Sequence, residues 1–248
     1  WWPLIAAAGT AGFFLLLTVS QMVVAFACGI TAIVAIVVWL WQTDNPPHAL
    51  TAEVADGVFL PVGARGTASH SWWAMIILLC VDASVFASLV FAHVHVSMAA
   101  DVCPPAGASL PNVFWPLASG ALLLAGSAAM FGAQALLARG RRAPVWALVL
   151  LAVLCVLAAF GMDGWGQQLA GLRPAANAWS ATVAAMLAWQ GFHVAVLVIM
   201  GLYVCARVWS GKLRVDARAS LDNTALLWHY VTVQGLAGMG IIYLMPLF

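Results

Sequence analysis

Apolar residues fall into long runs along the chain, and polar residues separate these runs at a few places. A helix that crosses a bilayer needs about 20 predominantly apolar residues to span roughly 30 Å of hydrocarbon. Each run that meets this requirement predicts one transmembrane helix. The runs are 71–97, 114–138, 144–162, 178–207 and 224–247.

The opening stretch, from Pro3 to Trp41, is apolar but too long for a single span. As one helix rising about 1.5 Å per residue, it would extend to about twice the thickness of the hydrocarbon core. The pair Ser20-Gln21, preceded by Thr18, is its polar break. We therefore predict two short helices joined by a tight turn, which gives seven spans in total.

The predicted fold class is an all-α integral membrane protein with seven transmembrane helices. We expect them to form a two-helix unit, 1–41, and a five-helix bundle, 71–248. The segment between them, 42–70, contains three prolines, three acids and two histidines, and is predicted to be a linker loop. Alanine also recurs every four residues from Ala121 to Ala133, a small-residue pattern typical of closely packed membrane helices.

Composition supports lipid as the main solvent of this chain. Hydrophobic residues make up 65% of its 248 positions and charged residues 7%, whereas a soluble domain normally has about a quarter charged residues. The net charge of +1 indicates neither a nucleic acid nor an acidic partner. The five cysteines are dispersed and form no CxxC pair, so neither a disulfide framework nor a thiolate metal site is supported.

The basic residues predict the orientation of the helices. With seven spans, the loops 42–70, 139–143 and 208–223 lie on the same side as the N-terminus. These loops and the adjoining helix end contain Arg65, Arg139, Arg141, Arg142, Arg207, Lys212, Arg214 and Arg218. The opposite side contains only Arg173. Because positive loops stay in the cytoplasm, we expect the N-terminus to be cytoplasmic and the C-terminus to lie outside.

Asp82 is the most informative single residue. It lies near the middle of the run 71–97, and a charged side chain at this depth costs about 2.5–3.5 kcal/mol on insertion scales. Either the carboxyl stays protonated, or it pairs with a group from another helix. Two roles remain open for it: a carboxyl that handles protons or binds lipid, and a hydrogen bond that only packs helices.

The histidines are the other candidates for chemistry. His93 follows Asp82 by eleven residues, which returns it to nearly the same helix face. His193 lies in the middle of one apolar run and His229 early in the next, so the two could act as axial haem ligands from facing helices. A hydrogen-bonded histidine is the commoner arrangement inside a membrane. The sequence contains no HExxH, phosphate loop or nucleophile elbow, so we predict no catalytic residue and no metal site.

Three stretches occur in the same order as in a known family. They are Trp72-Trp73-Ala74-Met75 with Val81-Asp82-Ala83-Ser84-Val85-Phe86, then Gln190-Gly191-Phe192-His193, and finally Trp228-His229-Tyr230-Val231. In combination they resemble subunit III of the haem-copper respiratory oxidases, the cytochrome c oxidase family. The division into two plus five helices is also similar to that family, so the resemblance covers the whole chain.

Several positions depart from the family pattern. Asp82 stands where the family usually has Glu, Val196 or a neighbour replaces a second histidine, and Thr232 replaces an Asp. These departures resemble those of oxidases in which subunits I and III are fused into one polypeptide. In that case the segment from Trp1 to Trp41 would continue directly from the catalytic subunit.

The resemblance implies an accessory subunit of a bacterial inner-membrane oxidase, with a periplasmic C-terminus. Such a subunit has no haem or copper of its own, since these belong to the catalytic subunit. It packs against subunit I or is fused to it, accompanies subunit II, holds phospholipid in a cleft between its two helix units and supports proton uptake.

The resemblance also assigns roles to individual residues. Asp82 corresponds to the family's buried carboxyl, and His193 and His229 to the histidines of the last two helices. His93 is a further candidate for their polar network. We expect a polar group of the sixth or seventh span, first of all His193, to hydrogen-bond Asp82. The candidates for the membrane interface and lipid headgroups are Trp72, Trp73, Trp228 and Arg207.

Two other classes of protein remain as alternatives. The chain could be a small b-type cytochrome with His193 and His229 as haem ligands, which an absorbance spectrum would reveal. It could also be a secondary transporter. Transporters, however, tend to contain repeats with matched helix breaks in two halves, and a division of two helices against five argues against transport.

Overall fold

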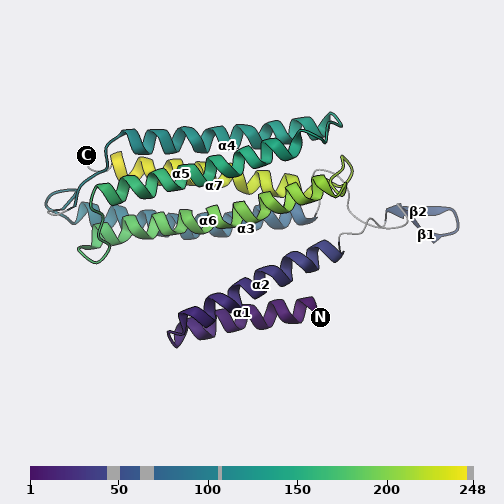
Figure 1. Ribbon diagram of the computed structural model, residues 1–248, viewed down its shortest axis with the longest axis horizontal. Helices are drawn as coiled ribbons and strands as arrows, with labels where there is room; N and C mark the ends of the chain where they lie inside the picture. Colours follow the sequence, from purple (N-terminus) through teal and green to yellow (C-terminus); the bar gives the residue numbers. More distant parts are fainter. Residues whose placement is uncertain (44–50, 62–69, 106–107, 245–248) are drawn as a thin grey trace. The chain divides into compact units, whose positions relative to one another are not determined.

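The computed structural model describes residues 1–43, 51–61, 70–105 and 108–244. Within these residues the chain is all-α apart from one two-stranded hairpin (Figure 1). The helices are α1 (Trp2–Thr18), α2 (Met22–Thr43), α3 (His70–Met98), α4 (Phe114–Ala138), α5 (Val145–Leu169), α6 (Ala178–Trp209) and α7 (Ala219–Leu244). The chain divides into two compact units, residues 1–63 and residues 64–248.

The helices identify the chain as a multi-pass membrane protein. In the described part of the chain, the six helices α2 to α7 are long and apolar enough to cross a bilayer. Helix α1 is equally apolar in character but has 17 residues, at the lower end of the length that spans hydrocarbon.

The turn predicted at Ser20-Gln21 is confirmed. Helix α1 ends at Thr18, and Ser20 adopts a left-handed backbone conformation with φ +59°. The Ser20 amide donates to the carbonyl of Leu17, and the Gln21 amide donates to that of Leu16 at 2.9 Å. This pair of bonds satisfies the last carbonyls of α1 and reverses the chain into α2.

Small residues hold α1 and α2 together. The buried positions are Ala6, Gly9, Ala25, Ala32 and Ala35. A Cβ atom on Gly9 would lie 2.9 Å from the backbone oxygen of Cys28, so the two backbones are in direct contact. In lipid, where apolar side chains gain nothing by leaving the solvent, such close backbone contact is what drives helices together.

The segment between α2 and α3 contains a hairpin that the sequence did not predict. Strand β1 (Thr51–Ala55) pairs antiparallel with β2 (Val58–Pro61), and Gly57 at φ +75° lies in the turn. Strands of five and four residues are too short to give a clear alternating pattern. Pro46, Pro47 and Arg65, which belong to the predicted loop, lie outside the described residues.

Helices α3 to α7 lie side by side in the second unit, and α7 contacts α3, α4 and α6 (Figure 1). Helix α7 is the most buried of the apolar helices described. The side chain of Trp228 on α7 packs closely against Gly126 of α4. A Cβ atom on Gly126 would lie 3.2 Å from Nε1 of this tryptophan. Asn177 caps the N-terminus of α6, because its side chain accepts a hydrogen bond from the Ser180 amide at 2.7 Å.

Two predicted helix limits were wrong. Helix α5 extends to Leu169 and α7 starts at Ala219, whereas the apolar runs placed these limits at 162 and 224. The apolar runs excluded the acids Asp163 and Asp222, but both belong to helices of the bundle. The end of the last run, 245–247, lies outside the described residues.

The alanine pattern of α4 also needs correction. Ala129 and Ala133 are buried, but Ala121 and Ala125 are exposed. A step of four residues turns about 400° around a helix, so the pattern drifts about 40° per step away from the packed face.

Candidate functional site

Asp82 forms the centre of a hydrogen-bonded cluster that joins three helices. Nε2 of His193 on α6 lies 3.1 Å from one carboxyl oxygen of Asp82, and the hydroxyl of Tyr230 on α7 donates to the other at 2.6 Å. The side chains of Asp82 and His193 are 15% and 5% exposed. The expected hydrogen bond between Asp82 and His193 is therefore confirmed. Tyr230 was missed as a site residue, although it follows His229 in the motif.

The second nitrogen of the His193 ring determines where a proton lies in this cluster. Nδ1 is 2.9 Å from the backbone oxygen of Trp189. A carbonyl oxygen can only accept, so Nδ1 carries a hydrogen and a neutral ring leaves Nε2 as an acceptor. One proton is then shared between Nε2 and Asp82, either on the carboxyl or on the imidazole. In both cases the pair is electrically neutral overall, which lowers the cost of its burial.

A second buried histidine joins the same two helices. His93 is fully buried, and its Nδ1 lies 2.9 Å from the hydroxyl of Thr182 on α6. Because that hydroxyl donates to the Trp179 carbonyl, it can only accept from His93. His93 is eleven residues after Asp82, and Thr182 is eleven residues before His193. Both pairs therefore fit one antiparallel contact between α3 and α6, and His93 shares the Asp82 face as predicted.

His229 belongs to a different polar group. Its Nδ1 lies 2.6 Å from the hydroxyl of Ser127 on α4, rather than near Asp82. His229 lines a cavity of about 200 Å³ with Trp72 and with Asp222, which accepts two hydrogen bonds from Arg218 at 2.7 and 2.8 Å. These bonds raise the pKa of Arg218. The Arg218–Asp222 pair was missed because both residues lay in a predicted loop.

The haem-ligand hypothesis finds no support in this geometry. Axial ligation needs two free donors on facing helices. Both ring nitrogens of His193 have partners, so His193 offers no free donor to a haem iron, and Nδ1 of His229 is paired with Ser127 of α4. Within the described residues, no group of three or more His, Cys, Asp or Glu side chains is placed to hold a metal ion.

The four interface candidates divide into two pairs. Trp72 is half-buried and Trp73 is 56% exposed, with their rings 5.1 Å apart at the start of α3. Trp228 and Arg207 do not fit contact with lipid headgroups, since they are 1% and 6% exposed. Trp228 packs in the bundle core, and Arg207 donates to the Lys212 carbonyl at 3.3 Å.

The three stretches that resemble subunit III meet in space. The first contributes Asp82, the second His193 and the third Tyr230. No protein-family model matches the chain, and no curated protein matches it. Asp82, His193 and Tyr230 are therefore the residues whose geometry bears on function.

Proposed function

We propose that this chain is the accessory subunit III of a terminal haem-copper oxidase of the cytochrome c oxidase class. One observation carries the proposal. Each of the three separate stretches that resemble this family supplies one side chain to the cluster of Asp82, His193 and Tyr230. Asp82 and His193 stand at the positions of the family's buried acid and histidine, so their contact supports the resemblance more strictly than isolated motifs do. Tyr230 stands where the family has Phe, so its hydrogen bond is a feature of this chain.

In this proposal all seven helices cross the bacterial inner membrane. Helix α1, with 17 residues, spans a locally thinned bilayer. The basic residues follow α4 and precede α7, as in Arg139, Arg141 and Lys212, whereas Arg173 alone lies between α5 and α6. The positive-inside rule then places the N-terminus in the cytoplasm and the C-terminus in the periplasm.

The Asp82 cluster supports a role in proton uptake and in stability. Asp82 and His193 share one proton within the bundle, and the bonds of Asp82 to His193 and Tyr230 join α3 to α6 and α7. Loss of either partner leaves a polar group unsatisfied in a medium without water, which costs several kcal/mol. The subunit thus keeps its helices in register while it presents a protonatable group at mid-membrane depth.

The partners in this proposal are those of the family. Subunit I, bound by helix packing or by covalent fusion, carries the haem and copper, and subunit II completes the enzyme. This chain contributes no redox centre. It stabilises the catalytic subunit and binds phospholipid in a cleft, where Trp72 and Trp73 serve as the headgroup contacts.

Purification of the tagged chain from native membranes tests the proposal. We expect mass spectrometry to identify a haem-copper subunit in the complex, as a separate chain or in the same polypeptide. The absorbance spectrum should show haem that remains with the catalytic subunit after the subunits are separated. Haem retained by the isolated chain would favour the cytochrome instead. A complex without a haem-copper subunit would refute the proposal.

A further inference from the structure

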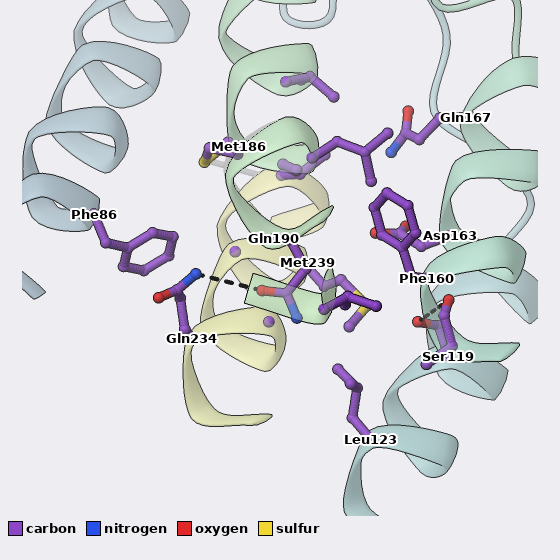
Figure 2. A pocket seen from close by; sticks show the side chains of 17 residues that line it. Phe86, Ser119, Leu123, Phe160, Asp163, Gln167, Met186, Gln190, Gln234 and Met239 are labelled. Atoms are coloured by element: carbon purple, nitrogen blue, oxygen red, sulfur yellow. Dashed lines mark hydrogen bonds between the residues drawn. The ribbon is translucent and has the colours of Figure 1, made fainter. Parts of the chain in front are cut away.

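A second polar site lies inside the five-helix unit, and Asp82 does not line it. It is a cavity of about 30 Å³, and Figure 2 shows the side chains that surround it. Helix α5 supplies Asp163 and Gln167, helix α6 supplies Gln190, and helix α7 supplies Gln234. The remaining lining is mostly apolar.

This cavity contains more hydrogen-bond acceptors than the protein satisfies. Gln167 and Gln234 are 3% and 4% exposed, and the side-chain oxygen of each is buried without a protein partner. The amide nitrogen of Gln234 is already used, since it donates to the Gln190 oxygen at 3.4 Å. The Asp163 carboxyl adds two more acceptor oxygens. A buried acceptor without a donor costs about 1–3 kcal/mol, so an occupant must donate hydrogen bonds.

The size of the cavity identifies water as that occupant. A buried water needs about 10–15 Å³, so about two waters fit in this space, whereas a lipid chain or an organic ligand does not. Two waters bring four donor hydrogens to the unsatisfied oxygens. The wall of the cavity formed by Phe160, Gln167 and Leu187 also lines a groove of about 320 Å³. That groove includes Pro174 in the α5–α6 loop, so the cavity and a surface groove share this wall.

Asp163 has no basic partner in this cavity. Among the described residues that line it, Asp163 is the only ionisable one: α4, α6 and α7 contribute serine, glutamine and apolar side chains, and α3 contributes Phe86. Outside the lining, Tyr243 of α7 interacts electrostatically with the carboxyl. A negative charge on Asp163 is therefore uncompensated, and a protonated carboxyl can donate to water while the waters donate to the glutamines.

We propose that Asp163 is a proton-exchanging carboxyl in a water-filled cavity that communicates with the surface through Gln167. The carboxyl releases its proton to a cavity water to give carboxylate and hydronium. The hydronium passes that proton outward past Gln167, and the reverse steps reprotonate Asp163. Nothing is oxidised or reduced. The inference rests on the cavity and its unsatisfied glutamines and does not depend on the proposed oxidase role.

Infrared difference spectroscopy of the intact complex, recorded between low and high pH, tests this inference. We expect a carbonyl-stretch band of a protonated carboxyl that is lost in Asp163→Asn and kept in Asp82→Asn, the matched change at the acid of α3. In deuterated water, Gln167→Leu should slow the exchange of this band about tenfold, the effect of one lost hydrogen bond in the path. Gln21→Leu, the same change at an exposed position between α1 and α2, should leave the rate unchanged.

Three results would overturn the inference. The first is a set of pH-dependent carboxyl bands that Asp163→Asn leaves unchanged. The second is a band that changes with sodium or potassium concentration at fixed pH, which would assign the cavity to a metal cation. The third is an empty cavity in a high-resolution map of the complex. If Asp163→Asn fails to assemble, Asp163→Glu provides a variant that retains a carboxyl, and its band must shift in frequency yet still exchange.

Discussion

Replacement of Asp82 by asparagine tests how the proton is held between Asp82 and His193. If the shared proton lies on Asp82, its carboxyl donates to Nε2 of His193 and accepts the Tyr230 hydroxyl at its other oxygen. Asparagine reproduces both bonds, since its NH₂ group donates and its oxygen accepts. We expect Asp82→Asn to keep the free energy of unfolding within about 1 kcal/mol of the wild type, although it removes the exchangeable proton.

Replacement by alanine gives the contrasting magnitude. Asp82→Ala leaves Nε2 of His193 and the Tyr230 hydroxyl without partners, and each such group costs about 1–3 kcal/mol. The expected loss is therefore about 2–6 kcal/mol. If Asp82 and His193 instead formed an ion pair, asparagine would remove one charge of a buried pair and cost about 3–5 kcal/mol. The two forms of the pair thus predict different results for the same asparagine variant.

Equilibrium unfolding in mixed lipid–detergent micelles, followed by tryptophan fluorescence, measures these differences. Ser84→Ala is the matched control, because Ser84 is exposed on the same helix and donates only to the Cys80 carbonyl of that helix. It should change stability by less than about 0.5 kcal/mol. Equal losses of unfolding free energy for Asp82→Asn and Asp82→Ala would refute the placement of the shared proton on Asp82. An Asp82→Ala variant as stable as the wild type would refute any structural role for the cluster.

Gly9→Leu should separate α1 from α2, because its side chain would meet the Cys28 backbone oxygen; we expect a loss of about 3 kcal/mol by thermal unfolding. Ser20→Gly should raise stability by about 1 kcal/mol in the same assay, because glycine adopts the left-handed conformation of this position without strain. Asp222→Ala should cost about 3 kcal/mol in chemical unfolding, because it leaves the partly buried Arg218 without its carboxylate.

Each of these three changes has a control within the chain. Ala8→Leu introduces the same side chain at an exposed position of α1. An equal loss of stability there would argue against close helix contact at Gly9. Ser20→Ala removes the hydroxyl but keeps the strain, so it should not stabilise the protein. Asp216→Ala breaks an exposed pair with Arg214 and should cost less than about 1 kcal/mol. Similar costs for Asp216→Ala and Asp222→Ala would contradict the importance of burial.

Apolar length was enough to predict where most helices lie, and polar residues inside helices were the source of the errors. The turn at Ser20 was correct because two polar residues interrupt an otherwise apolar stretch. The ends at Asp163 and Asp222 were wrong because each acid lies at the edge of an apolar run, where it was taken as the start of a loop, whereas Asp82 has apolar residues on both sides. Asp163 instead lines a polar cavity, and Asp222 pairs with Arg218. Hydropathy does not include hydrogen bonds such as the one that Gln134 of α4 donates to Asp222.

The candidate site could be predicted in part from helical periodicity. The eleven-residue spacing of Asp82 and His93 placed them on one face of a helix, and the structure has both on the contact with α6. Helical periodicity fixes such a face from sequence alone. The choice between His193 and His229 as the partner of Asp82 depends on how α7 is rotated. Tyr230 points to Asp82, and so its neighbour His229 is directed toward Ser127 of α4.

Helix α6 connects the two acidic sites of the bundle. His193 bonds Asp82, and Gln190, three residues earlier, lines the Asp163 cavity and accepts from Gln234. Residues three apart are neighbours on one side of a helix, so the two polar groups occupy adjacent positions of α6. The side chain of Gln190 also donates to the Val231 carbonyl of α7, next to Tyr230. A rotation of α6 would therefore alter both sites at once.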